Sequence, residues 1–107
     1  MKNILILIFI LCATSLYSQE YSLLEINAKW NKENSLPFTK LADIRIGFAW
    51  LEDQPERVKN SVMSVPTLIL MKNGRNVHQW QAGINLQLSI TEEDIIKALK
   101  RIDEKDR

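Results

Sequence analysis

Residues 65–74 read Val-Pro-Thr-Leu-Ile-Leu-Met-Lys-Asn-Gly, and this stretch decides the fold class. Its apolar run, Leu68–Met71, predicts a β-strand. The Asn73-Gly74 pair predicts a tight hairpin turn, because both residue types accept positive φ at little cost. The run Val77–Ala82 is then expected to return as the antiparallel partner of the first strand.

Two further strands are expected before this hairpin. Ser22–Trp30 is an apolar segment with Glu25 and Asn27 set among its residues. Ile44–Leu51 is almost continuously apolar, which predicts a strand that is covered on both faces. With the hairpin these segments predict a four-stranded mixed sheet.

Helices are expected between the strands and at the end of the chain. Leu36–Ala42 predicts a short helix, and a second helix is expected from an N-cap at Asp53, with Val58 and Val62 on its inner face. Thr91 is the predicted N-cap of a last helix, whose apolar stripe comprises Ile95, Ala98, Leu99 and Ile102. The charged tail after that stripe is expected to fray. The predicted fold class is α/β, in the order β-α-β-α-β-β-α, with helices on both faces of the sheet.

Residues 1–18 are predicted to be a secretory signal peptide. A basic start, the apolar run Ile4–Leu11 and an exit rich in small and polar residues form the usual pattern. The run is shorter than the about 20 residues that span a bilayer. Cleavage is expected after Ser18, with Ser15 as the alternative, and leaves one domain over 19–107; an uncleaved N-terminal anchor is the other interpretation.

The predicted mature chain has no net charge and no cysteine. The sequence has 14 basic and 13 acidic residues, and Lys2 is the only charged residue of the leader. This balance excludes a strongly basic nucleic-acid binder and a charge-driven membrane binder. The single cysteine, Cys12, leaves with the leader, so the mature domain has no disulfide, thiolate metal site or cysteine nucleophile. The leader predicts a periplasmic or secreted location, of which a bacterial periplasm is preferred.

This order of elements, with three of its motifs, resembles the thioredoxin family from about Ser22 to Ile102. The Val65-Pro66-Thr67 segment, its strand and the Lys-Asn-Gly turn are similar to the family's cis-proline, strand and hairpin. Leu23 to Trp30 resembles the central strand, which ends in a tryptophan just before the family's Cys-x-x-Cys. The third similar segment is Asp53-Gln54-Pro55. The family's first strand and helix have no counterpart, so the resemblance implies a truncated thioredoxin-like domain.

The sequence departs from the family where the family carries its chemistry. The Cys-Gly-Pro-Cys motif is matched by Asn31-Lys32-Glu33-Asn34, so both cysteine positions hold amides. Thiol–disulfide exchange needs a thiolate, which an amide cannot supply. The resemblance therefore implies the fold without the usual activity, and no catalytic residue is predicted.

The resemblance also implies a shallow groove that binds extended polypeptide. Its lining residues would be Trp30, Asn31, Asn34, Val65 and Pro66, with a strand-like peptide docked beside Val65. Trp30 suits such a contact, since tryptophan is large and partly polar. The alternative is that Pro66 only fixes the bend before the strand and that Trp30 only caps the core.

The remaining polar residues indicate no catalytic or metal site. His78 is expected to be an ordinary strand residue. The acidic residues around Asp53 are interpreted as a helix N-terminus rather than a weak Ca²⁺ site. Glu25 matches the family's buried acid, but it is expected to lie half-exposed on an edge or to pair with Lys29 or Lys72, because a buried unpaired carboxylate is costly.

Three functions follow from these observations. The favoured one is an exported, redox-inactive module that binds a protein or peptide client, without cofactor, metal, nucleic acid or, in its mature form, membrane. The alternative is a thiol–disulfide oxidoreductase-related protein of cell redox homeostasis that uses a partner's cysteines. A folded spacer or subunit is the third. Neither the client nor the oligomeric state follows from the sequence.

Overall fold

The computed structural model describes residues 21–105 of the 107-residue chain. The predicted signal peptide over residues 1–18, with its two cleavage sites, lies outside the described residues. Within residues 21–105 no helix is long and apolar enough to cross a bilayer.

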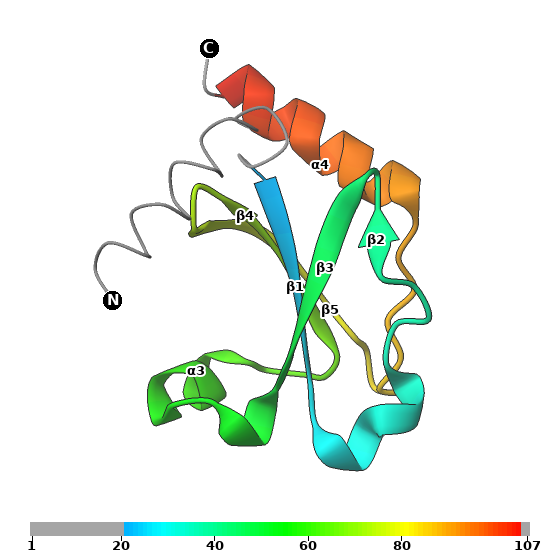
Figure 1. Ribbon diagram of the computed structural model, residues 1–107, viewed down its shortest axis with the longest axis vertical. Helices are drawn as coiled ribbons and strands as arrows, with labels where there is room; N and C mark the ends of the chain where they lie inside the picture. Colours follow the sequence, from blue (N-terminus) through cyan, green and yellow to red (C-terminus); the bar gives the residue numbers. More distant parts are fainter. Residues whose placement is uncertain (1–20, 106–107) are drawn as a thin grey trace, which may run out of the picture.

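The described chain is a small α/β domain with one five-stranded mixed sheet, ordered β2-β3-β1-β4-β5 (Figure 1). The strands are β1 (Tyr21–Asn27), β2 (Lys40–Leu41), β3 (Ile44–Trp50), β4 (Thr67–Lys72) and β5 (Arg75–Gln81). β1 is central: it runs parallel to β3 and antiparallel to β4. The helices are α3 (Glu56–Ser61) and α4 (Glu92–Lys105), and the 3-10 segments are η1 (Lys29–Asn34) and η2 (Leu51–Asp53).

The sheet has five strands rather than the predicted four, and the helix predicted over Leu36–Ala42 is absent from the described chain. In its place the backbone forms the short strand β2, which pairs with the start of β3. Ala42 and Asp43 make the turn with φ of 50° and 62°, a left-handed conformation that ends any right-handed helix. The segment is too short to nucleate a helix by itself, and burial of Leu41 in the core favours the extended form.

The prediction that β3 is covered on both faces was wrong. Ile44 and Ile46 pack against the core, whereas Arg45 and Gly47, which alternate with them, are exposed. Further along, Phe48 is 46% exposed and meets Trp50 edge to face, with ring centroids 4.7 Å apart. The apolar run of β3 therefore belongs to a strand with one open face, flanked on its outer side only by the two-residue β2.

The hairpin predicted at Asn73-Gly74 was confirmed. Both residues have positive φ, 53° and 82°, and Lys72 pairs with Arg75 across the turn. The Val65–Pro66 peptide bond that precedes β4 is cis, as the resemblance implied. The two strands slip by one residue between Leu70 and Met71. β5 begins at Arg75, two residues before the expected Val77, because pairing with β4 starts directly after the two-residue turn.

The predicted start and apolar stripe of the last helix were also confirmed. The Thr91 Oγ1 accepts a hydrogen bond from the Asp94 N–H, and the Asp94 carboxylate accepts the Thr91 N–H at 2.9 Å, a reciprocal capping box. The Thr91 N–H, together with the Thr91 hydroxyl that also donates to this carboxylate, holds the pKa of Asp94 below its ordinary value. The tail after Ile102 was expected to fray, but the helix continues to Lys105.

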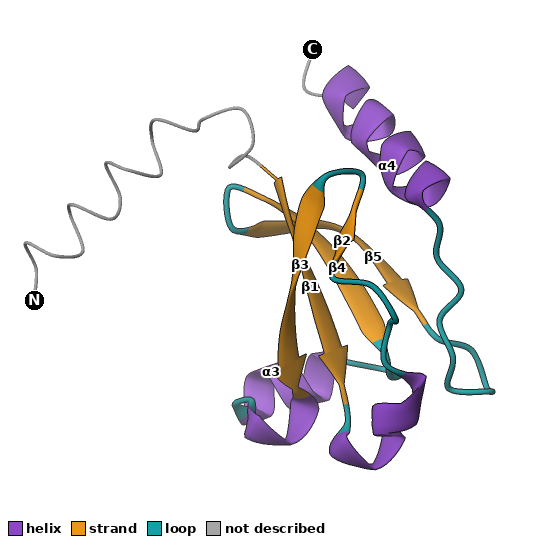
Figure 2. Cartoon of the chain, turned by 45° about the vertical axis from the view of Figure 1, so that its right-hand side comes forward, coloured by secondary structure: helices purple, strands orange, loops and turns teal. Residues whose placement is uncertain are grey.

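The core lies between α4 and one face of the sheet. Its fully or nearly buried members come from β1, β2, β4 and α4 and the segment before α4, and they are Leu23, Leu41, Leu68, Leu70, Ile90, Ile95 and Ala98. α3 does not cover this core; it lies with η1 at the end of the sheet to which β1 and β3 point (Figure 2). It also begins later than predicted, because Asp53 belongs to η2 and Pro55 occupies the N-cap position without a side-chain cap.

Candidate functional site

The candidate site forms at one end of the sheet, where β1 and β5 end and β4 begins. β1 ends at Asn27, while β4 begins at Thr67, which pairs with Ile26. Because these strands are antiparallel, the segment after β1 and the segment before β4 emerge at the same end. β5 ends there too, since Gln81 pairs with Thr67. Residues 28–34, 62–66 and 82–87 are thereby brought together.

Three asparagines form a hydrogen-bonded group at this end, here called the amide cluster (Asn27, Asn31 and Asn34). The Asn31 Nδ2 donates to the Asn27 Oδ1 at 3.1 Å, and the Asn31 Oδ1 accepts from the Asn34 Nδ2 at 2.7 Å. The Asn27 Nδ2 in turn donates to the Asn31 backbone carbonyl and to the Ser35 hydroxyl, and its Oδ1 accepts the Ala28 N–H. Asn27 is completely buried and Asn31 is 5% exposed. The cluster therefore fixes the turn that follows β1.

The amide cluster reaches the proline through Asn31. The Asn31 Nδ2 lies 3.3 Å from the carbonyl oxygen of Val65, the residue before the cis bond. The same nitrogen lies 3.1 Å from the Leu86 carbonyl, and the Gln87 side chain donates to the Asn34 Oδ1 at 3.4 Å. Leu86 has a φ of 59°, which turns the loop after β5 over the cluster. This loop closes one side of the site.

The five residues predicted to line the groove are thus neighbours in space or sequence, but they differ in exposure. Asn31, Val65 and Pro66 are buried, and Asn34 is half-buried. Trp30 alone among them is well exposed, at 67%. A ligand would reach the tryptophan directly, whereas the Val65 carbonyl already accepts an internal hydrogen bond from Asn31.

Two further exposed apolar residues belong to segments at the same end of the sheet. Met63, in the segment before β4, is 81% exposed, and Ile84, in the loop after β5, is fully exposed. We call Trp30, Met63 and Ile84 the apolar rim. Exposed apolar side chains indicate a contact surface where they form one patch, and the segments that carry these three residues meet at the same end of the sheet. Sequence reasoning missed Met63 and Ile84 because neither falls on an apolar position of a predicted strand or helix.

Trp30 is held in place through its neighbour Lys29. The Lys29 N–H donates to both carboxylate oxygens of Glu52, at 3.1 and 3.0 Å, and its Nζ lies 3.4 Å from the Asp53 carboxylate. The acidic residues that the sequence suggested as a helix N-terminus therefore clamp η2 to the start of η1. This contact supports the orientation of the segment that carries Trp30.

Glu25 lies beneath the site. It was expected from the sequence to be half-exposed on an edge, but it is buried. It is 3% exposed, because β1 is the central strand, and its Oε2 accepts the Leu36 N–H at 3.0 Å. Burial raises the pKa of Glu25 above its ordinary value, and the Leu36 hydrogen bond offsets part of that rise. The predicted partner Lys29 is bound to Asp53 instead.

A neutral replacement at Glu25 is expected to stabilise the domain at neutral pH. The unfolded carboxyl ionises before the folded one, so the stability that Glu25 contributes is present at low pH and is lost as the pH rises through the folded pKa. Glu25→Gln keeps an oxygen for Leu36 and removes the charge. We expect its free energy of unfolding to exceed that of the wild type by on the order of 1 kcal/mol at pH 7, and the gain to disappear near about pH 3.

Urea unfolding at a series of pH values measures this effect, with the exposed Glu33→Gln as the matched control. A Glu25→Gln protein that is less stable than the wild type at every pH would mean that the hydrogen bond to Leu36 outweighs the burial of charge.

The chemistry available at the site is hydrogen bonding and apolar contact. No member of the amide cluster ionises or acts as a nucleophile at neutral pH. Among residues 21–105 there is no group of three or more His, Cys, Asp or Glu side chains that could hold a metal ion. The chain matches no protein-family model and no curated protein.

Proposed function

We propose that this chain is a redox-inactive thioredoxin-like domain that binds an extended protein or peptide through the apolar rim. The observation that carries the proposal is the contact between the Asn31 side chain and the Val65 carbonyl beside the cis bond. It brings the two asparagines at the family's cysteine positions to the backbone segment that, in the family, receives polypeptide. A binding surface without exchange chemistry is the function that fits these residues.

Three other features support the thioredoxin resemblance. The strand that precedes Trp30 is the central strand of the sheet, and a cis-proline immediately precedes β4. A buried carboxylate, Glu25, lies on this strand. All three features match the family, and for Glu25 the burial agrees with the family's acid rather than with the half-exposed position that was expected.

The structure favours side-chain contacts over backbone pairing at this site. Val65 is buried and its carbonyl is engaged by Asn31, so a client strand would have to displace that hydrogen bond. Trp30, Met63 and Ile84 need no rearrangement to contact a client. Apolar side chains of an extended segment, such as an unfolded chain presents, are therefore the proposed ligands of the rim.

Removal of rim side chains is expected to weaken binding of an unfolded client. Reduced, carboxymethylated lysozyme serves as the probe, because it is permanently unfolded and cannot exchange disulfides. We expect Trp30→Ala to weaken its binding by about tenfold, the usual scale for a central tryptophan, and Ile84→Asp to weaken it as well. Ile96→Ala, an exposed apolar residue on α4, is the matched control and should leave binding unchanged.

Site-specific photocrosslinking from position 30 checks the same contact directly. Equal binding by the wild type and both rim variants would refute the proposal. A stable oligomer whose contacts avoid the rim, combined with no binding of the probe, would favour the folded-subunit interpretation instead.

The oxidoreductase alternative predicts turnover. A partner's thiolate would need a sulfur atom on this chain to form a mixed disulfide, and the one cysteine, Cys12, lies in the predicted leader. Insulin reduction by the purified protein would support that alternative if it is much faster than in the same solution without the protein, whether or not a dithiol is present.

A further inference from the structure

A groove runs between the edge strand β5 and helix α4, away from the apolar rim. Three adjoining cavities of about 480, 290 and 230 Å³ make up this groove. The first and second share Val77 and Ile102, and the second and third share His78, Ala98 and Arg101. The start of β5 faces the end of α4, so the two elements run in opposite directions along the groove.

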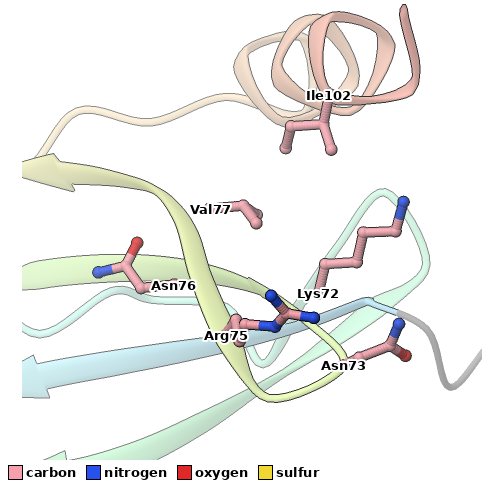
Figure 3. A pocket seen from close by; sticks show the side chains of 6 residues that line it. All are labelled: Lys72, Asn73, Arg75, Asn76, Val77 and Ile102. Atoms are coloured by element: carbon pink, nitrogen blue, oxygen red, sulfur yellow. The ribbon is translucent and has the colours of Figure 1, made fainter. Parts of the chain in front are cut away.

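The groove has an apolar floor and a basic border. In its largest cavity Ile102 points from α4 toward Val77, while Lys72 and Arg75 lie at the hairpin end (Figure 3). On the helix side the border is a stripe of three cations, namely Lys97, Arg101 and Lys105. The acidic residue that lines the cavities is Asp94, whose carboxylate is already bound by Thr91. A surface of this charge selects an anionic ligand.

The stripe is regular, and within the described part of the chain none of its cations takes part in an ion pair, although Lys97 interacts electrostatically with Asp94. Lys97, Arg101 and Lys105 are spaced i, i+4 and i+8, so that they share one helix face and rise by about 6 Å per step. The ion pairs of the described residues are Lys29–Asp53 and Lys40–Asp43, and neither includes a member of the stripe. Alternate side chains of an extended peptide repeat at about 6.8 Å, close to the spacing of the stripe.

The other wall of the groove is an open sheet edge. β5 is the last strand in the order β2-β3-β1-β4-β5, so within the described chain one row of its backbone groups faces no partner strand. Its 7 residues span about 23 Å, and the 14 residues of α4 span about 21 Å. An added strand would therefore lie beside the stripe along most of its length.

We propose that this groove binds an extended acidic peptide segment, which pairs with the edge of β5 and places carboxylates at alternate positions against Lys97, Arg101 and Lys105. Strand addition supplies main-chain hydrogen bonds, and the stripe supplies the selection for acidic side chains. The proposal does not rest on the function of the apolar rim, because the two surfaces share no residue.

Fluorescence anisotropy with a labelled peptide in which Glu and Thr alternate tests the proposal. A peptide of the same composition, with all Glu in one block and all Thr in another, separates spacing from bulk charge. We expect the alternating peptide to bind more tightly, Arg101→Gln to weaken it by on the order of fivefold, and the pair Arg101→Gln with Lys105→Gln to weaken it by about tenfold or more. Arg57→Gln on α3 is the matched control and should have no effect.

Circular dichroism and thermal unfolding verify that each variant is folded, and the variants replace only exposed side chains. Equal binding of the block and alternating peptides would overturn the proposal, as would an equal loss in Arg57→Gln or unchanged affinity in the double variant. Tighter binding to phosphatidylglycerol vesicles than to the peptide, lost in the same double variant, would assign the groove to a lipid surface and also overturn it.

Discussion

Replacement of Asn31 and Asn34 by cysteine is expected to give a protein that reduces insulin, whereas we expect the wild type not to reduce it. The two side chains already meet across one helical turn, with the Asn34 Nδ2 2.7 Å from the Asn31 Oδ1. Two thiols at these positions lie close enough to form a disulfide after modest rotation of the side chains. Loss of the Asn31 amide also releases the Val65 carbonyl for a substrate backbone.

The measurement is the rate of insulin reduction in the presence of a dithiol, together with a thiol count before and after oxidation. A matched control places cysteines at Arg57 and Asn60, two exposed α3 positions with the same i, i+3 spacing and without the Val65 carbonyl. We expect the control pair to add nothing to the rate of the dithiol. If the Asn31→Cys, Asn34→Cys protein folds but is no faster than this control, the thioredoxin resemblance at the site is wrong.

Asn27→Asp is expected to destabilise the domain strongly. Asn27 is fully buried, and its Nδ2 donates to the Asn31 carbonyl and to the Ser35 hydroxyl. A carboxylate of nearly the same shape has no N–H to donate, and it brings a charge into a fully buried position. We expect a loss of about 2–4 kcal/mol in the free energy of unfolding at pH 7.

Urea unfolding of Asn27→Asp and of the exposed control Asn60→Asp checks this prediction. The control should stay within about 0.5 kcal/mol of the wild type. The loss in Asn27→Asp should be smaller at pH 4 than at pH 8, because protonation removes the buried charge and restores one donor. A loss below about 1 kcal/mol at both pH values would show that the cluster contributes little to the stability of the turn after β1.

The local sequence pattern did not predict the role of Asn27. Asn27 appears in that pattern as one polar position in an apolar strand, and nothing in the alternation says that it organises the turn that follows. The signal that was present is its spacing, since Asn27 and Asn31 are four residues apart on either side of the strand end. The contacts with the Leu86 and Val65 carbonyls had no such signal, because they join segments separated by 55 and 34 residues.

Local patterns were sufficient for several elements. The Asn-Gly turn, the Thr91 cap and the stripe around Ile95 depend on interactions within a few residues, and all three were confirmed. The helix predicted around Leu41 was wrong, because helix propensity is weak over so few residues. Burial of side chains in the tertiary structure then selects the strand β2. The prediction that both faces of β3 are covered was wrong, because an apolar run does not show whether one face of the strand or both are packed.

The sequence is enough to establish that positions 31 and 34 carry amides, which neither ionise nor exchange disulfides, since the identity of a side chain limits its chemistry wherever it lies. It is also enough to place four of the five strands, the hairpin and the last helix to within a few residues, whereas the short strand β2 was missed. The tertiary structure was needed to show that Asn31 donates a hydrogen bond to the Val65 carbonyl and that Trp30 is exposed while Val65 is buried. It was also needed to show that the basic stripe lies beside the edge strand β5. Exposure and distant contacts depend on how the elements pack, and packing joins residues whose separation along the chain leaves no local pattern.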